Sequence, residues 1–329
     1  MNNLQPKMLR EARAARPGKN IFLEILIFFA VFLVGSSLAS IPTSIAMVPW
    51  LVQEIDKGIE EVGPGWVSLE NIMNLMNRMP SWMSIVNLFS MGLLTLTAIL
   101  FCRWLQKRRA ATLGFRKSKA ATEYLVGAAF GILTISMTVG ISALTGAFTF
   151  STARVSVPLL LLYLLGFGIQ GMAEETLCRG YFLTSMARRN PVWAATLVSS
   201  LVFGLLHIAN PGFGILPLVN IALIGASFGV YFLKRGNIWG VSAMHSFWNF
   251  FQGNVYGISV SGTGAGNGAT PLVAASVPGK ELWNGGAFGI EGSLPCTIVC
   301  VITLLLFLFV LPKKRDEYVS EAPKTEETR

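Results

Sequence analysis

Long apolar stretches separated by short polar segments dominate this chain. Eight of them reach or approach the roughly 20 residues that a helix needs to cross about 30 Å of bilayer hydrocarbon. We place them at 21–48, 82–105, 123–148, 156–186, 192–209, 214–233, 238–256 and 294–312. None alternates apolar and polar positions over about ten residues, as strands of a membrane barrel do. The pattern predicts an all-α fold, a polytopic transmembrane helical bundle of about eight spans.

Composition agrees with a membrane protein and changes the meaning of the net charge. Hydrophobic residues make up 53% of the 329 residues and charged residues only 13%. The formal net charge is +9, which in a soluble protein would suggest nucleic acid. Here the basic residues lie in short clusters at the ends of apolar stretches, so we interpret them as topology information and expect no nucleic-acid partner.

The basic clusters fall on alternate connections between the predicted spans. Lysine and arginine crowd the N-terminus, the 103–119 connection, the turns at 188–189 and 234–235, and the tail from Lys313. The remaining connections are poor in basic residues or acidic: 51–81, 149–155, 210–213 and 257–293. Because basic connections stay on the cytoplasmic side, we predict that both termini are cytoplasmic.

The order of spans and loops divides the chain into four parts. Residues 1–154 hold an N-terminal cytoplasmic segment and three spans, of which the first is too long for a signal-peptide core and predicts a retained anchor. Residues 155–256 form a core of four spans. Residues 257–312 hold a Gly-rich extracytoplasmic loop, for which we expect little regular structure, and the final span. Residues 313–329 form a charged cytoplasmic tail that we expect to be disordered.

One further element is expected outside the spans. The second half of 51–81 follows a Gly63-Pro64-Gly65 breaker and is rich in methionine and leucine. We predict an interfacial amphipathic helix there.

Ionisable residues interrupt the fourth apolar stretch. Glu174, Glu175 and Arg179 follow a run of leucines, and insertion scales assign about 2.5–3.5 kcal/mol to each such group at the centre of a membrane helix. The only two histidines of the chain, His207 and His245, fall in later predicted spans. Ionisable groups at membrane depth mark functional sites, so we expect these residues to meet in one site.

Helix geometry gives the two glutamates different surroundings. Glu175 and Arg179 are four residues apart, in the favoured order for an intrahelical ion pair. Glu174 is rotated by about 140° from Arg179 at 3.6 residues per turn. We therefore expect Glu175 to be neutralised and Glu174 to be free for chemistry. The alternative is that both glutamates only pair with Arg179 or line a polar seam.

Two later spans carry polar pairs at the same spacing. Phe203 and His207 share one helix face, and His245 and Asn249 share another. A carboxylate withdrawn from bulk water can take a proton from water, and an imidazole can position that water. A second imidazole and an amide can donate hydrogen bonds to the oxyanion of a tetrahedral intermediate. Together with Glu174, these residue types suit peptide-bond hydrolysis inside a membrane.

Three motifs thus occur in order on successive spans. They are Glu174-Glu175-x-x-x-Arg179, Phe203-x-x-x-His207 and His245-x-x-x-Asn249. In this order the segment 155–255 resembles the CPBP family of CAAX proteases and bacteriocin-processing enzymes, also called the Abi family. The resemblance implies an intramembrane glutamic endopeptidase. It implies that Glu174 activates water with His207, that His245 and Asn249 form the oxyanion site, and that Glu175 with Arg179 holds the first helix in place, with Phe203 supporting.

The resemblance also implies a setting for the enzyme. Eukaryotic members remove the last three residues of prenylated CAAX proteins, and bacterial members are linked to bacteriocin maturation, self-immunity and membrane-bound regulators. We expect a multi-pass protein of a bacterial plasma membrane that acts on a membrane-associated, prenylated or bacteriocin-like peptide. The resemblance suggests access from the cytoplasmic side. The three additional spans and the long loops leave the substrate open.

Other functions use the same residue types. Glu174, His207 and His245 could ligate zinc in a site with an open position, but the chain has no HExxH motif, and we expect no cofactor. A proton-coupled transporter also needs intramembrane Glu and His, yet we detect no repeat pair of the kind that many transporters carry. A non-catalytic immunity factor or scaffold could bind a partner through the same polar cavity.

The four cysteines add no further chemistry. Their positions, Cys102, Cys178, Cys296 and Cys300, form neither a disulfide framework nor a CxxC metal site. Cys178 lies one turn after Glu174 and could be a nucleophile, but we interpret it as a packing residue.

Overall fold

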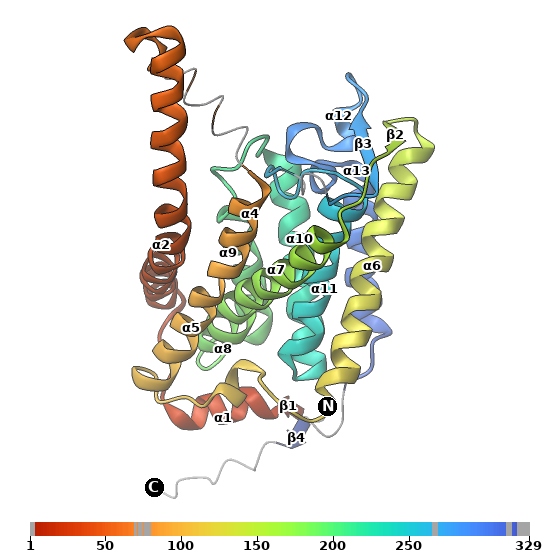
Figure 1. Cartoon of the computed structure of the whole chain (residues 1–329). Coiled ribbons are helices and arrows are strands. Elements are labelled where there is room, and N and C mark those ends of the chain that lie inside the picture. The colour runs from red at the N-terminus through yellow and green to blue at the C-terminus, as the bar shows by residue number, and fades with distance from the viewer. Residues whose placement is uncertain are drawn as a thin grey trace, which may run out of the picture.

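The computed structural model describes residues 4–68, 71, 75, 80–264, 269–313 and 318–320. Helices dominate these residues, and the described strands form two short two-stranded sheets. The prediction of a mostly helical fold is confirmed for these residues. Figure 1 shows the long helices side by side, with the short strands at the two ends of the bundle.

Each predicted span coincides with helical structure. The helices are α2 (Ile21–Val62), α4 (Ser81–Ser90), α5 (Gly92–Trp104), α6 (Ala120–Leu144), α7 (Val157–Glu175), α9 (Val192–Leu205), α10 (Ile215–Arg235), α11 (Ile238–Phe250) and α13 (Leu294–Phe309). Among the described residues, five segments are long and apolar enough to cross a membrane: Ile21–Val62, Ser81–Trp104, Ala120–Leu144, Val157–Met186 and Ile215–Arg235. Val192–Leu205 and Leu294–Phe309 are apolar but shorter. The count of eight spans therefore stays a prediction.

Shorter elements complete the described chain. They are the helices α1 (Lys7–Ala15), α8 (Thr184–Met186) and α12 (Glu281–Asn284), the 3₁₀ turns η1 (Pro64–Trp66), η2 (Ala110–Leu113), η5 (Gly286–Phe288) and η6 (Ile290–Gly292), and the π-helical segments η3 (Thr176–Leu183) and η4 (Phe251–Val255). The strands are β1 (Leu4–Pro6), β2 (Phe148–Thr152), β3 (Leu272–Ser276) and β4 (Tyr318–Ser320). Because η3 joins α7 to α8 without a break, the polar motif at 174–179 lies where an α-helix widens into a π-helix, a feature frequent at functional sites.

Strands β1 and β4 lie at one end of the bundle, which we call the terminal end. They pair in antiparallel register, and Figure 1 shows them there beside α1. The connections predicted to share one side of the membrane meet at this end: Arg13 Nη2 donates to Ala187 O (2.9 Å), Arg116 pairs with Glu11 (2.9 Å), and Trp239 Nε1 donates to Arg116 O (3.2 Å). The tail was expected to be disordered, but its residues 318–320 form a strand.

The other end of the bundle, which we call the opposite end, contains more regular structure than expected. Strands β2 and β3 pair over five residues, and α12, η5 and η6 follow within 257–293. The expectation of little regular structure there is wrong because side chains order this loop. Asn284, for example, donates to Ala147 O and Val277 O at 3.1 Å each.

The segment 51–81 also differs from its prediction. Helix α2 does not end near residue 48 but continues to Val62, with Pro42 and Pro49 inside it. Lys57 pairs with Glu54 at 2.7 Å one turn away, which supports a solvent-exposed helical extension. The predicted interfacial helix in the second half of 51–81 falls mostly outside the described residues.

Glycines let α6 approach α11, the helix that carries His245. A Cβ atom on Gly127 would lie 1.8 Å from Gly240 O, and one on Gly131 would lie 2.3 Å from Met244 O. Both distances are far below a van der Waals contact, so side chains at these positions would force the two helices apart. This contact fixes the depth and rotation of α11 in the bundle.

Candidate active site

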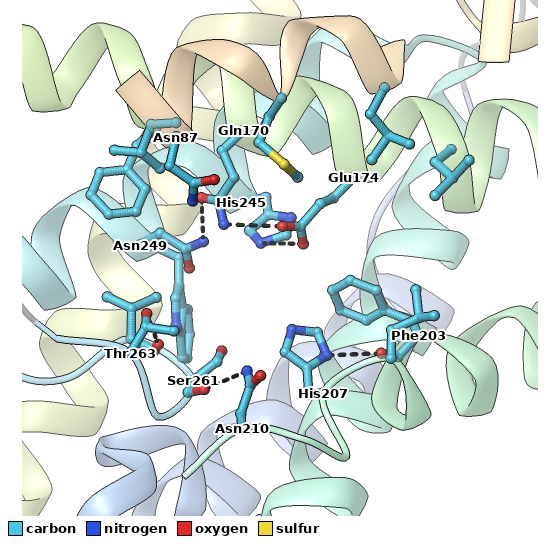
Figure 2. Close-up of a pocket in the computed structure, with 18 of the residues that line it drawn as sticks. Asn87, Gln170, Glu174, Phe203, His207, Asn210, His245, Asn249, Ser261 and Thr263 are labelled. Carbon is cyan, nitrogen blue, oxygen red and sulfur yellow. Dashed lines mark hydrogen bonds and ion pairs between the residues drawn. The ribbon is translucent and has the colours of Figure 1, made fainter. Parts of the chain in front are cut away.

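A cavity of about 790 Å³ lies between α2, α4, α7, α9, α10 and α11. Its lining includes all four predicted catalytic residues, which are Glu174, His207, His245 and Asn249. Figure 2 shows Glu174 and His245 on one side of the opening and His207 facing them from the other. Four residues from α7, α11 and the turn after α9 therefore meet in one space, as predicted.

Glu175 and Arg179 form the predicted ion pair behind the cavity wall. Arg179 Nη1 donates to Glu175 Oε1 at 2.7 Å, and both side chains are fully buried. The guanidinium carbon lies 4.4 Å from the ring centroid of Phe203 and 5.6 Å from that of Phe228, within the range of cation–π contacts. Phe203 therefore supports the pair by covering the arginine.

His245 links the two glutamates, which the sequence analysis did not foresee. Its Nδ1 donates to Glu175 Oε1 at 2.9 Å, and its Nε2 lies 3.7 Å from Glu174 Oε2. The second distance exceeds a hydrogen bond, so this nitrogen is still available to a group in the cavity. Glu175 thus holds both Arg179 and His245 through one oxygen.

Gln170 is a site residue that the sequence analysis missed. Its Nε2 donates to Glu174 Oε1 at 3.0 Å, and its Oε1 accepts from Asn249 Nδ2 at 3.1 Å. Figure 2 shows it between these two side chains at the cavity. The available signal was its position four residues before Glu174, which places a polar side chain on the same face of an otherwise apolar helix.

His207 lies in the turn that follows α9 and not within the helix. Its Nδ1 is 2.9 Å from Phe203 O. A carbonyl oxygen only accepts, so Nδ1 carries the hydrogen, and in the neutral ring Nε2 then keeps its lone pair. No described residue hydrogen-bonds to Nε2, which leaves it available for a water or a substrate.

A second polar wall comes from loops that were given no role in the sequence analysis. Asn210, Ser261 and Glu291 line the cavity, and Figure 2 shows Asn210 and Ser261 on the same side as His207. Asn210 Nδ2 donates to Ser261 O at 2.7 Å. Glu291 Oε2 accepts from Ser261 N at 2.6 Å, from Ser261 Oγ at 2.9 Å and from Gln252 Nε2 at 3.1 Å. A buried carboxylate therefore holds the loop that forms this wall.

The three candidate zinc ligands, Glu174, His207 and His245, do not converge on one point. Within the described part of the chain, no three His, Cys, Asp or Glu side chains are close enough together to hold a metal ion. Glu174 and His245 approach each other, but His207 faces them across the opening in Figure 2. Cys178 lines the cavity but is 1% exposed.

Comparison with known proteins agrees with the motifs. Residues 155–251 match a family model described as Type II CAAX prenyl endopeptidase Rce1-like. The matched segment includes every residue of the three motifs. Searches of curated proteins and of solved structures found no match. Residues 155–251 are therefore similar to the Rce1-like type II CAAX prenyl endopeptidase family, and this similarity is consistent with the CPBP family that the motifs resemble.

Proposed function

We propose that this membrane protein is an intramembrane endopeptidase that hydrolyses a peptide bond with water activated by Glu174. The observation that carries the proposal is the geometry of the cavity. Glu174, His207, His245 and Asn249 line one space, while Glu175 alone neutralises Arg179. Glu174 has no cation at hydrogen-bond distance among the described residues, so its carboxylate is free to act on water.

The proposed reaction uses only side chains of this chain. Glu174 takes a proton from a water that His207 Nε2 orients from across the cavity, and the water oxygen attacks the peptide carbonyl carbon. In its imidazolium form, which the neighbouring carboxylates of Glu174 and Glu175 stabilise, His245 donates from Nε2 to the oxyanion that forms, and so does the second N–H of the Asn249 amide. Glu174 then returns its proton to the leaving amine nitrogen as the C–N bond breaks. Glu175 and Arg179 hold His245 and the helix in position.

The proposed substrate is a membrane-associated peptide, including a prenylated CAAX-like or a bacteriocin-like one. The proposed setting is a bacterial plasma membrane, without a cofactor and without a nucleic-acid partner. The apolar part of the cavity, with Phe32, Met47 and Phe167, suits an apolar or lipidated segment, and the polar residues suit a peptide backbone.

The deciding experiment is cleavage by Glu174→Gln in reconstituted protein, measured on a panel of prenylated and unprenylated peptides. Loss of a general base lowers the rate by about 10²–10⁴-fold, and the expected result is a fall of that size for every peptide that the unmodified protein cleaves. Glu281→Gln, an exposed glutamate at the opposite end, is the matched control. Undiminished cleavage by Glu174→Gln would remove Glu174 from the role of base.

Two further outcomes separate the alternatives. If Glu174→Gln keeps the biological function of the protein in cells, the scaffold or immunity role is correct and the peptidase role is not. Metal analysis of the purified active protein tests the metal-free mechanism. Stoichiometric zinc that is lost together with activity would contradict it.

A further inference from the structure

The exposed part of the cavity lining lies at the opposite end. Ser84 and Asn87 in the first turns of α4, and Thr263 and Gly264 in the loop after η4, line the cavity and are exposed. The start of α4 and the loops near β3 are at the end of the bundle away from β1 and β4 in Figure 1. The mouth of the cavity is therefore formed by α4 and the 258–264 loop.

Buried side chains close the cavity toward the terminal end. Two lining residues on α5 and η3, Leu94 and Cys178, are only 2% and 1% exposed. One to two turns closer to the terminal end, aromatic rings from α2, α5 and η3 stack against each other. Phe28 lies 4.1 Å from Phe182 between centroids, and Tyr181 lies within 5.3 Å of a ring on α5.

A buried arginine network continues this closure. Arg108 is fully buried beyond the aromatic layer. Its Nη1 donates to Gln106 Oε1 and Ser185 Oγ at 2.8 Å each, and its Nε donates to Thr112 Oγ1 at 3.1 Å. Every N–H group of this guanidinium points at a neighbouring protein group. Arg108 therefore provides no polar path from the terminal end to Glu174.

The charge distribution assigns the mouth to one side of the membrane. The basic connections gather at the terminal end, and the loops at the mouth belong to the connections poor in lysine and arginine. Cytoplasmic connections carry the excess of basic residues. The described lining of the cavity contains Glu174 and Glu291 and no lysine or arginine, so nothing in it would hold the free carboxylate of a cytoplasmic C-terminal substrate.

We propose that the active site takes its peptide from the extracytoplasmic side, through the mouth between α4 and the 258–264 loop, and that its substrate is an exported or membrane-anchored peptide. This inference rests on the proposed function. It narrows the substrate class by excluding the prenylated C-terminus of a cytoplasmic protein. It also differs from the cytoplasmic access that the family resemblance suggests.

Labelling of single introduced cysteines tests the position of the mouth without any need for activity. All four native cysteines are buried, so the unmodified chain serves as the background. Ser84→Cys, Asn87→Cys and Thr263→Cys place a thiol at the mouth. Lys117→Cys and Arg189→Cys place one on exposed positions of the terminal end, and Glu281→Cys places one on the opposite end. The probe is a membrane-impermeant maleimide, applied to intact cells and to permeabilised cells.

The expected result is that the three mouth variants and Glu281→Cys are labelled in intact cells, whereas Lys117→Cys and Arg189→Cys are labelled only after permeabilisation. Labelling of the mouth variants together with the two terminal-end variants would overturn the proposal. The proposal would also be overturned if the three mouth variants stayed unlabelled in intact and in permeabilised cells while Glu281→Cys, Lys117→Cys and Arg189→Cys reacted. Because labelling is independent of turnover, a failure here is distinct from failure of the Glu174→Gln test.

A second measurement connects the mouth to the substrate class. Soluble quenched peptides are added outside sealed vesicles whose orientation is known from the Lys117→Cys labelling. We expect cleavage that depends on Glu174 and that occurs only when the mouth faces the added peptide. Glu174-dependent cleavage only in the reverse orientation would contradict extracytoplasmic access while leaving the peptidase function intact.

Discussion

At the scale of single residues, Gln170 connects Glu174, the proposed base, to Asn249, a proposed donor to the oxyanion. It holds Glu174 and Asn249 through two hydrogen bonds, and each such bond contributes about 0.5–1.5 kcal/mol. Gln170→Leu removes both, so we expect kcat to fall by about 5- to 160-fold, given that 1.36 kcal/mol corresponds to a factor of ten. The measurement is kcat of purified protein, with Gln53→Leu, an exposed position on α2, as control.

The effect of Gln170 on Glu174 can also be measured in the rate–pH profile. Gln170→Glu places another carboxyl group at hydrogen-bond distance from Glu174, and two adjacent carboxylates resist being ionised together. We therefore expect the rate–pH profile of this variant to move to higher pH. A lower kcat with an unchanged profile in both variants would mean that Gln170 only fills space.

Arg179 makes the largest contribution to stability that we can assign to one side chain of the site. Its removal leaves the Glu175 carboxylate fully buried, and Glu175 Oε2 already has no hydrogen-bond donor among the described residues. Breaking a buried pair in this way costs about 3–5 kcal/mol, so Arg179→Met should sharply lower the thermal unfolding temperature in detergent. Arg189→Met, which changes an exposed arginine, should stay within about 0.5 kcal/mol of the parent. A partial recovery is expected when Glu175→Gln is added to Arg179→Met.

At the scale of helices and loops, α11 depends on its close contact with α6. Gly131→Ala would place a methyl group 2.3 Å from Met244 O, a backbone atom next to His245 that cannot rotate away. Overpacking of this kind costs about 1–3 kcal/mol, and the displaced α11 would carry His245 and Asn249 with it. We therefore expect loss of both thermal stability and cleavage activity.

Gly140 on the same helix supplies the matched control. A Cβ atom there would meet nothing within 4 Å, and alanine has the higher helix propensity by up to about 1 kcal/mol. Gly140→Ala should therefore be neutral or slightly stabilising in the same thermal assay. Equal effects of the two substitutions would show that the contact between α6 and α11 is not what positions His245.

Properties that depend on neighbours along one helix could be predicted from the sequence. The apolar stretches predicted the helices, and the four-residue spacing predicted the bond between Glu175 and Arg179. The features that could not be predicted from the sequence depend on contacts between elements. Gln170 is a site residue because Asn249 comes from another helix, and the 257–293 loop is ordered because a buried carboxylate, Glu291, collects three donors from residues up to 39 positions away.

At the scale of the whole molecule, the number of membrane crossings decides which side each loop occupies. Helix α9 has 14 residues and α13 has 16, so at 1.5 Å per residue they are shorter than the about 30 Å of hydrocarbon. Nevertheless, the chain returns to the terminal end after α8, where Arg13 Nη2 donates to Ala187 O at 2.9 Å, and after α10, where Trp239 Nε1 donates to Arg116 O at 3.2 Å. The end of α13 lies beside the end of α10, because Lys234 Nζ donates to Leu308 O and Leu311 O at 2.8 and 2.9 Å. This is possible only if α9 and α13 each run between the two ends, with turns at their ends or a locally thinner bilayer making up the length.

The prediction of eight crossings implies a fixed pattern for reporters of membrane sidedness. A reporter that is active only in the cytoplasm should work when fused after residues 117, 189, 236 and 329, and a reporter that is active only outside should work after residues 63, 154 and 279. If α9 and α13 did not cross, the reporters after 189 and 236 would fall on different sides, and those after 279 and 329 on the same side. That result would contradict both the eight-span count and the assignment of the cavity mouth, because the arrangement of basic connections at one end would no longer correspond to one side of the membrane.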